Sequence, residues 1–334
     1  MATRKTKVTV LGSGGWGTAI AHLCADADLD TLLWGRDAGL LDSIKTRRRN
    51  DRYLPGLELA AGIEVEPDLT KAIEASDILL GCVPTQHIRS NLTPHRDRIA
   101  GKLYVNTAKG IEVGSNLRVS EILKEVAPKV RYAMLSGPSF APEVVRRLPT
   151  VVTIASPVKN DAIEMQNILR TDYFRSYIST DVAGVELAGA LKNVIAIAAG
   201  IVVGLDLGFN AQAALINRGL MEVARLGRKF GADPLTFLGL AGMGDLVLTC
   251  TGPLSRNRRL GEMLGLGKPR AQAEKELGGV AEGVFTVKAA MALGQQLEVE
   301  LPIIEQVYRI VHEGADPASA VPALMRRDFR EEFL

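Results

Sequence analysis

Cysteine is scarce in this sequence. The 334 residues include three cysteines, Cys24, Cys82 and Cys250, which stand far apart without a CxxC pair or a nearby pair of histidines. This spacing excludes a disulfide framework and the usual zinc-binding patterns. We therefore expect no metal site and a reducing compartment, the cytoplasm.

An excess of charge of one sign and a long apolar run are also lacking. Forty basic and 38 acidic residues give a net charge of +2, so no overall charge attracts nucleic acid or an anionic membrane. The first apolar run stops at Gly12 after four residues, which excludes the core of a signal peptide. The most apolar long segment leaves only twelve uncharged residues, 194–205, and we expect a buried core helix there rather than a membrane span.

A glycine-rich turn near the N-terminus is the first motif that points to a ligand. The apolar run Val8–Leu11 meets glycines 12, 14 and 17, and a helix-favouring stretch follows from Thr18 to Ala27. In a dinucleotide site the first glycine allows the tight turn, the second lets the backbone approach a pyrophosphate, and the third lets the helix lie on the strand. An ordinary strand–helix turn has the same spacing, but the flanking strand and helix favour a nucleotide.

The end of the next expected strand bears on the choice of cofactor. Residues 31–34 are followed by Gly35, Arg36 and Asp37. An acidic residue here often binds the ribose 2′-hydroxyl, whereas an arginine suits a 2′-phosphate. Arg36 is equally compatible with a solvated surface position, and Asp37 with a cap on the following helix. The order of the residues favours acceptance of NADP as well as NAD.

The first half of the chain predicts a Rossmann-like α/β fold. Strand-like runs alternate with helical segments, which indicates a doubly wound, mostly parallel sheet in residues 1–180. Lys109 follows one of these strands, at the edge of the sheet where ligands bind. The expected strands are residues 8–11, 31–34, 63–65, 78–83, 103–106, 131–135, 150–155 and 174–178, with a helix at 160–169.

From residue 181 onward the strand-like runs disappear. Four segments predict helices, at residues 185–203, 211–229, 282–297 and 303–312. We expect an all-α second domain, residues 181–334, that forms the substrate side of a cleft between the domains.

Three polar stretches stand out in this helical part. Lys192 lies in an otherwise apolar helix, so it reaches solvent, pairs with a carboxylate, or acts in a cleft with a lowered pKa. Asp245 follows two glycines and is either the partner of a lysine or a helix cap. Ser255 is a candidate cap for a helix beginning with Arg256 and Asn257, which would suit a phosphate or form a solvated basic terminus.

Together these motifs resemble the NAD(P)-dependent glycerol-3-phosphate dehydrogenases of the bacterial biosynthetic type, over roughly residues 7–315. The resemblance implies reversible reduction of dihydroxyacetone phosphate to sn-glycerol 3-phosphate for phospholipid synthesis, by a homodimer. The matching stretches are GSGGWGTA (12–19), LLWGRD (32–37), NTAKGIE (106–112), SGPSFAPE (136–143), VELAGALKNVIAIAAG (185–200), GDLVLTCTGPLSRNRR (244–259) and VAEGVFTVK (280–288).

The resemblance also implies residue roles. Lys192 would donate the proton to the alkoxide oxygen, with Lys109 beside substrate and nicotinamide and Asp245 as their polar partner. Substrate would be bound by Lys109, Gly137, Ser139, Lys192, Asp245, Ser255, Arg256 and Asn257. The cofactor would be bound by Gly12, Gly14, Gly15, Trp16, Gly17, Arg36, Lys109, Ala141, Arg256, Val280 and Glu282.

Two other functions share part of this pattern. A 3-hydroxyacid or 6-phosphogluconate-type dehydrogenase also pairs a nucleotide domain with a helical domain and a catalytic lysine. A cofactor-binding sensor without catalysis could keep the glycine turn alone. The basic run that begins at Ser255 favours a small phosphorylated ketone. Trp16, Ser139 and Met243 depart mildly from the commoner family residues and leave the chemistry in place.

Overall fold

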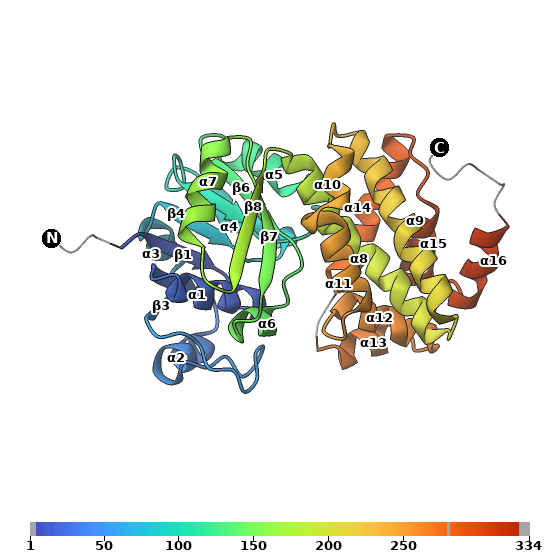
Figure 1. Ribbon diagram of the computed structural model, residues 1–334, viewed down its shortest axis with the longest axis horizontal. Helices are drawn as coiled ribbons and strands as arrows, with labels where there is room; N and C mark the ends of the chain where they lie inside the picture. Colours follow the sequence, from blue (N-terminus) through green and yellow to red (C-terminus); the bar gives the residue numbers. More distant parts are fainter. Residues whose placement is uncertain (1–4, 279–280, 327–334) are drawn as a thin grey trace.

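The protein forms two halves that lie side by side (Figure 1). The structure is a computed structural model and describes residues 5–278 and 281–326. All strands in these ranges fall in residues 5–180, here called the sheet half, and residues 181–326, the helical half, contain helices and turns. The predicted change of character at residue 181 is therefore visible in the secondary structure.

One sheet organises the sheet half. Within the described residues its eight strands follow the order β3-β2-β1-β4-β5-β6-β7-β8. Neighbours are parallel from β3 to β6, β7 is antiparallel to β6, and β8 is parallel to β7. The predicted mostly parallel sheet is confirmed, with β1 (Lys7–Leu11), β2 (Asp30–Trp34), β3 (Ile63–Glu66), β4 (Ile78–Gly81), β5 (Leu103–Asn106), β6 (Arg131–Ser136), β7 (Thr150–Ala155) and β8 (Phe174–Ser179).

Helices cover both faces of this sheet, as the doubly wound prediction requires. On one face Val10 joins a core with Ile20 and Met165, and on the other Leu79 packs in a core with Ile122. Successive strand residues point to opposite faces, so strands with two covered faces are apolar throughout. The covering helices are α1 (Gly15–Asp26), α2 (Ala38–Arg47), α3 (Leu69–Glu74), α4 (Ile88–Leu92), α5 (Val119–Val126), α6 (Ala141–Val145) and α7 (Lys159–Ile168).

The helical half is built around its longest helix. Helix α8 packs against α9, α11, α12 and α14. The four predicted long helices are confirmed as α8, α9, α14 and α15. Of the shorter ones between them, the start of α12 after Ser255 is confirmed, a helix beside Asp245 was one of two alternatives, and α10 and α13 were not predicted. The elements are α8 (Val182–Gly204), α9 (Gly208–Arg228), α10 (Pro234–Leu238), a π-turn (Leu240–Gly244), α11 (Asp245–Thr251), α12 (Arg256–Gly265), α13 (Arg270–Glu276), α14 (Glu282–Gln296), α15 (Pro302–Glu313) and α16 (Ala320–Met325).

Helix α8 is the buried core helix that the sequence predicts. By length and composition it could cross a membrane, because its most apolar window has a mean hydropathy of 1.9. The apolar segment is therefore longer than the twelve uncharged residues, 194–205, that the sequence analysis counted. Inside the protein, however, 89% of that window is buried. Its two charged residues, Glu186 and Lys192, both form ion pairs within the protein. This burial is what a core helix shows.

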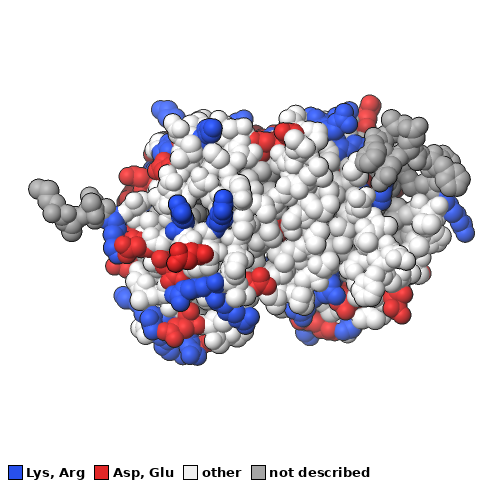
Figure 2. Space-filling view, in the orientation of Figure 1, with Lys and Arg blue, Asp and Glu red and all other residues white. Residues whose placement is uncertain are grey.

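Charged side chains are distributed unevenly on the face seen in Figure 2. They gather around the lower part of the sheet half, near α2 and β3, whereas the middle of this face is largely uncharged. Both signs are interspersed in the charged region. This face therefore has no extended field of one sign, in keeping with the net charge of +2.

Helices α8 and α12 cross with their backbones in contact. A Cβ atom on Gly261 would lie 1.9 Å from the carbonyl oxygen of Ile197, and one on Gly200 would lie 2.0 Å from that of Arg258. No side chain fits at either point. The two glycines thus fix how α12, which begins at Arg256, is placed on α8.

We expect Gly261→Ala to lower the free energy of unfolding by about 1–3 kcal/mol or more, because the new methyl group forces two backbones apart. Urea unfolding followed by circular dichroism measures the effect. Gly39→Ala is the control, since its Cβ would meet only the Asp37 side chain at 3.5 Å in a helix, where alanine is favoured. Equal stability of Gly261→Ala and the wild type would contradict the contact.

Candidate active site

The glycine turn joins β1 to α1 with the geometry that the sequence predicts. Gly12 has a φ of +126°, and a Cβ on Gly17 would lie 1.8 Å from the Gly12 carbonyl oxygen. Gly14 is the N-cap without a side-chain cap, and a Cβ on it would meet nothing within 4 Å. Helix α1 begins at Gly15, earlier than the predicted Thr18, because the helix starts inside the glycine motif. The first N–H groups of α1 have no acceptor within the helix, and the space beside Gly14 is open.

The remaining predicted residues of this turn lie in the first turn of α1. Gly15 and Trp16 open the helix, and the Trp16 indole N–H is buried with no hydrogen-bond partner in the described part of the chain. At the end of β2, Asp37 caps α2 by accepting a hydrogen bond from the Leu40 N–H at 3.0 Å. It also pairs with Arg52 at 3.2 Å. The cap interpretation of Asp37 is confirmed, and the neighbouring Arg36 is exposed.

The centre of the site is one buried carboxylate held by two lysines. Lys192 Nζ lies 2.6 Å from Asp245 Oδ1, and Lys109 Nζ lies 2.6 Å from Asp245 Oδ2. Asp245 and Lys192 are almost fully buried, whereas Lys109 is 16% exposed. Lys109 follows β5 of the sheet half, and the other two residues belong to the helical half. Asp245 is the first residue of α11 and no cap, so the lysine-partner interpretation is the one the geometry supports.

Thr249 completes this cluster and was missed by the sequence analysis. It lies one turn after Asp245 on α11, and Lys192 Nζ is 2.6 Å from its hydroxyl oxygen. That hydroxyl donates to the Asp245 carbonyl oxygen at 2.6 Å. The signal available in the sequence was its i+4 spacing from Asp245, which puts both residues on one face of a helix.

Burial and charge act against each other on these groups. Burial lowers the pKa of Lys192 to about 8, although the Asp245 charge opposes the shift. Burial would raise the pKa of Asp245, but the two lysines outweigh it and hold it below its usual value. The lysine is therefore poised to exchange a proton near neutral pH while the aspartate stays ionised.

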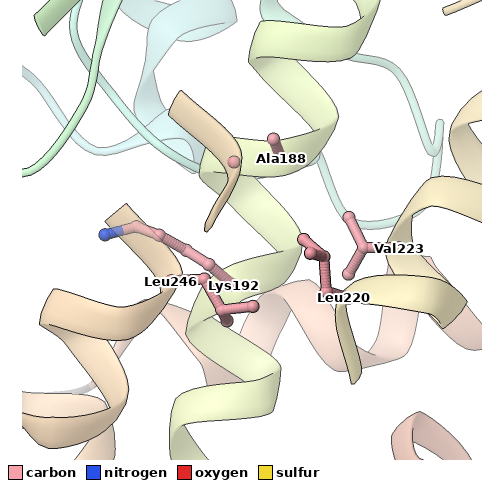
Figure 3. A pocket seen from close by; sticks show the side chains of 6 residues that line it. Ala188, Lys192, Leu220, Val223 and Leu246 are labelled. Carbon is pink, nitrogen blue, oxygen red and sulfur yellow. The ribbon is translucent and has the colours of Figure 1, made fainter. Parts of the chain in front are cut away.

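The stem of Lys192 also lines a closely packed apolar recess, together with Ala188, Leu220 and Val223. Figure 3 shows that the Lys192 nitrogen points away from Leu220 and Val223. Only the aliphatic part of the side chain contacts the apolar group. The ammonium is thus free to face the polar cluster while the stem is fixed by packing.

The strand β6 ends beside this cluster. Gly137, with a φ of +146°, directs its carbonyl oxygen to Lys109 Nζ at 3.3 Å and accepts the Ser139 hydroxyl at 3.0 Å. Ala141 begins α6 immediately afterwards. A Cβ on Gly244 would lie 3.6 Å from Pro138, so this loop contacts the segment just before Asp245. The sequence-predicted Gly137, Ser139 and Lys109 are therefore brought together.

The start of α12 supplies the predicted basic terminus. Ser255 is the N-cap, and its hydroxyl accepts from the Arg258 N–H at 3.2 Å. Arg256 is exposed, whereas Asn257 is buried. The N–H groups of Arg256 and Asn257 lie in the first turn, where no carbonyl of the helix can accept them. This terminus can bind an anion.

Asn257 links this terminus to the rest of the site through its side chain. Its amide nitrogen donates to Asn193 Oδ1 at 3.0 Å, and its oxygen accepts from the Gly283 N–H at 3.0 Å. Asn193 donates to the Lys109 carbonyl oxygen at 3.3 Å. These hydrogen bonds join four separate segments, and the bridging part of Asn193 was not predicted. Side-chain bridges of this kind leave no periodic signal in a sequence.

The last two predicted cofactor residues lie near residue 281. Glu282 begins α14 and is partly buried. Burial raises its pKa above the usual value, against the positive charges of Arg256 and the two lysines. Val280 lies outside the described residues. Within residues 5–278 and 281–326, no group of three or more histidine, cysteine or acidic residues is placed to hold a metal ion.

We expect Asp245→Asn to lower the pKa of Lys192 below 8, by about 1–3 pH units, because burial and the Lys109 charge then act unopposed. An NMR titration of the lysine Nζ and Cε resonances measures it. Asp37→Asn removes a carboxylate that caps α2 and should leave the Lys192 titration unchanged. An unchanged or higher pKa in Asp245→Asn would contradict the proposed balance.

Comparisons with known proteins agree with this architecture. Residues 7–162 match the family model described as NAD-dependent glycerol-3-phosphate dehydrogenase N-terminus, and residues 181–322 match the corresponding C-terminus model. A glycerol-3-phosphate dehydrogenase [NAD(P)+] of Solidesulfovibrio magneticus is 46% identical over 98% of this chain and 100% of its own length. One of Bacillus thuringiensis is 45% identical over 98% and 97% of the two chains.

A solved structure is similar over the whole length. The glycerol-3-phosphate dehydrogenase of Coxiella burnetii superposes with a TM-score of 0.93 and 38% identity, over 97% of this chain and 99% of its own. The two family models match regions in both halves. These regions include the glycine turn and the segment that carries Lys192. This chain belongs to the NAD-dependent glycerol-3-phosphate dehydrogenase family.

Proposed function

We propose that this protein is an oxidoreductase that reversibly reduces dihydroxyacetone phosphate at C2 to sn-glycerol 3-phosphate with NADH or NADPH. The product would supply phospholipid synthesis. The observation that carries the proposal is the buried Lys192–Asp245–Lys109 cluster beside the basic start of α12. A proton donor and an anion site linked through the Asn193–Asn257 hydrogen bond suit a small phosphorylated ketone.

The sheet half fits a dinucleotide. The open Gly14 position and the exposed N–H groups of α1 would receive the pyrophosphate, and Arg36 would meet the adenosine ribose or its 2′-phosphate. When bound, the cofactor supplies or accepts the hydride. The residues proposed to hold it are Gly12, Gly14, Gly15, Trp16, Gly17, Arg36, Lys109, Ala141, Arg256, Val280 and Glu282.

Lys192 is the proposed proton donor. Hydride addition at C2 leaves negative charge on the ketone oxygen, and the Lys192 ammonium neutralises it by giving up one proton. A pKa of about 8 makes both protonation states accessible, so neutral Lys192 accepts the proton in the oxidation direction. Asp245 fixes the position of the ammonium, and Lys109 shares the carboxylate and adds positive charge beside the oxygen.

The start of α12 is the proposed phosphate site. Ser255, Arg256 and Asn257 present a helix N-terminus, unpaired N–H groups and a guanidinium to a dianion. Gly137 and Ser139 would line the opposite side of the substrate. Because Gly261 and Gly200 hold α12 directly on α8, the distance from this site to Lys192 is fixed.

We further propose a dinucleotide-binding domain, residues 1–180, a substrate domain, residues 181–334, a homodimer and a cytoplasmic location. Exposed apolar side chains on the helical half, Phe209, Leu235 and Leu238 among them, support self-association. The free thiols of all three cysteines support a reducing compartment.

The assay that tests the activity follows NAD(P)H oxidation with dihydroxyacetone phosphate, unphosphorylated dihydroxyacetone and 3-oxoacids as alternative substrates. The proposal requires turnover of the phosphorylated ketone at the highest kcat/KM. Preference for a 3-oxoacid would assign the protein to the hydroxyacid type, and binding of NAD(P)H without any turnover would make it a sensor.

We expect Lys192→Ala to lower kcat at least about 1000-fold, because the developing alkoxide loses its proton donor. NADH binding, measured by fluorescence quenching, should stay within twofold of the wild type. Lys288→Ala removes an exposed lysine of α14 and serves as the control. A kcat near the wild-type value in Lys192→Ala would exclude Lys192 as the donor.

Arg256→Ala should lower kcat/KM for dihydroxyacetone phosphate roughly 30- to 1000-fold, corresponding to about 2–4 kcal/mol for a lost charged contact. Turnover of unphosphorylated dihydroxyacetone, measured with saturating NADH so that the proposed cofactor contact of Arg256 does not limit the rate, should change little, since this substrate has no phosphate to bind. Arg259→Ala, an exposed arginine on the same helix, is the matched control. Equal losses for both substrates would place the phosphate elsewhere.

A further inference from the structure

A second buried carboxylate, Glu186, lies near the start of α8 and bonds across to the sheet half. Its Oε1 accepts from the Ser120 N–H at 2.8 Å and the Tyr132 hydroxyl at 2.6 Å. Its Oε2 accepts from the Ser120 hydroxyl at 2.6 Å and from Arg118 at 3.1 Å. Glu186 is 5% exposed. Each carboxylate oxygen is therefore held by two donors, all from the other half of the protein.

Burying an ionised carboxylate at this position costs free energy, because the charge loses its hydration. Burial raises the pKa of Glu186, and the four donors only partly offset the cost of keeping it ionised. Apolar side chains of similar volume often stabilise such a place as well or better. Unlike apolar packing, four directed hydrogen bonds define the position and orientation of the helix that carries the carboxylate.

The donors themselves are held on rigid elements. Ser120 lies in the first turn of α5, which has a capping box between Arg118 and Glu121. Tyr132 is a buried residue of β6. Arg118 also stacks over the Phe230 ring at 5.3 Å, just beyond the end of α9. The carboxylate thus lies between strand β6 and the first turn of α5.

The same helix and the same strand continue to the candidate active site. Along α8, Glu186 precedes Lys192 by under two turns, which is roughly 9 Å of helix. Along β6, Tyr132 precedes Gly137, whose carbonyl oxygen faces Lys109. Between these points a Cβ on Gly189 would lie 2.9 Å from the Ser136 hydroxyl, so helix and strand are also in contact midway.

We propose that Glu186 is a positioning residue for proton transfer, an inference that rests on the proposed role of Lys192. By fixing α8 on β6 and α5, it sets the position of the Lys192 ammonium relative to Lys109 and Gly137, the part of the site that the sheet half supplies. Asp181, the cap of α8, does not do this, because its carboxylate accepts from Gly184, Asp233 and Thr236, which all belong to the helical half. A shift of about 1 Å at a reacting centre costs on the order of 100-fold in rate.

The experiment compares Glu186→Gln and Glu186→Asp with Glu222→Gln. Glu222 is a buried carboxylate of α9 that accepts from the Ile303 and Ile304 N–H groups, inside the helical half. Glu222→Gln therefore removes a buried charge but leaves the hydrogen bonds of Glu186 to the sheet half in place. Measurements are kcat and KM for dihydroxyacetone phosphate, NADH affinity by fluorescence, the solvent deuterium isotope effect on kcat, and melting temperature, all taken well below melting.

The proposal requires Glu186→Gln to lower kcat about 10- to 100-fold, with KM and NADH affinity within about threefold and a larger solvent isotope effect. Glu186→Asp should recover part of kcat, and Glu222→Gln should lose stability but keep kcat. A crystal structure of Glu186→Gln should show α8 displaced relative to β6. Unchanged kcat in Glu186→Gln, or an equal loss of kcat in Glu222→Gln, would overturn the proposal.

These outcomes are separate from those of the proposed function. If the wild type does not reduce dihydroxyacetone phosphate, or Lys192→Ala retains turnover, the proposed function fails whatever Glu186 does. If both of those tests succeed and Glu186→Gln behaves as the wild type, only the positioning inference fails. Should Glu186→Gln not fold, Glu186→Asp, which keeps the charge, decides between the two outcomes by the same kcat and isotope measurements.

Discussion

The bond that the rest of the site depends on is the double ion pair at Asp245. One carboxylate bridges two ammonium groups from different halves of the protein, Lys109 from the loop after β5 and Lys192 from α8. Without the aspartate two like charges would face each other in a buried space, which a low-dielectric environment penalises strongly. With it, the attraction of the carboxylate opposes the lowering of the Lys192 pKa by burial and holds it at about 8. The ion pairs at Asp245 therefore both join the two halves of the protein and set the pKa of Lys192.

Helix α8 connects this ion-pair cluster to the sheet half at one end and to α12 at the other. Its first turns are bonded to the sheet half through Glu186, its middle carries Lys192, and its later turns touch α12 backbone to backbone at Gly200. Each contact is short and leaves little freedom for sliding. The anion-binding terminus of α12 and the proton donor thus belong to one rigid unit, which is what a reaction between two small, precisely placed groups needs.

Much of this could be predicted from sequence because the signals were local. The strands, the long helices and the glycine turn follow from periodicity and from backbone conformations that only glycine adopts easily, as Gly12 shows. Lys192 and Asp245 were recognisable because a charge in an apolar run requires a partner. Thr249 and the side-chain bridge through Asn193 were missed, because their importance comes from contacts between distant segments. The start of α1 was also placed too late, since the helix begins within the glycine motif itself.

The burial of α8 has a consequence for how the chain is made. Helix α8 ends at Gly204, whereas α12, whose backbone covers it, begins only at Arg256 and α14 at Glu282. On the ribosome the most apolar helix of the protein therefore emerges well before the segments that shield it. Until they follow, its surface is open to chaperones and to other nascent chains. The helix that gives the finished protein its rigidity is thus the segment most exposed to aggregation during synthesis.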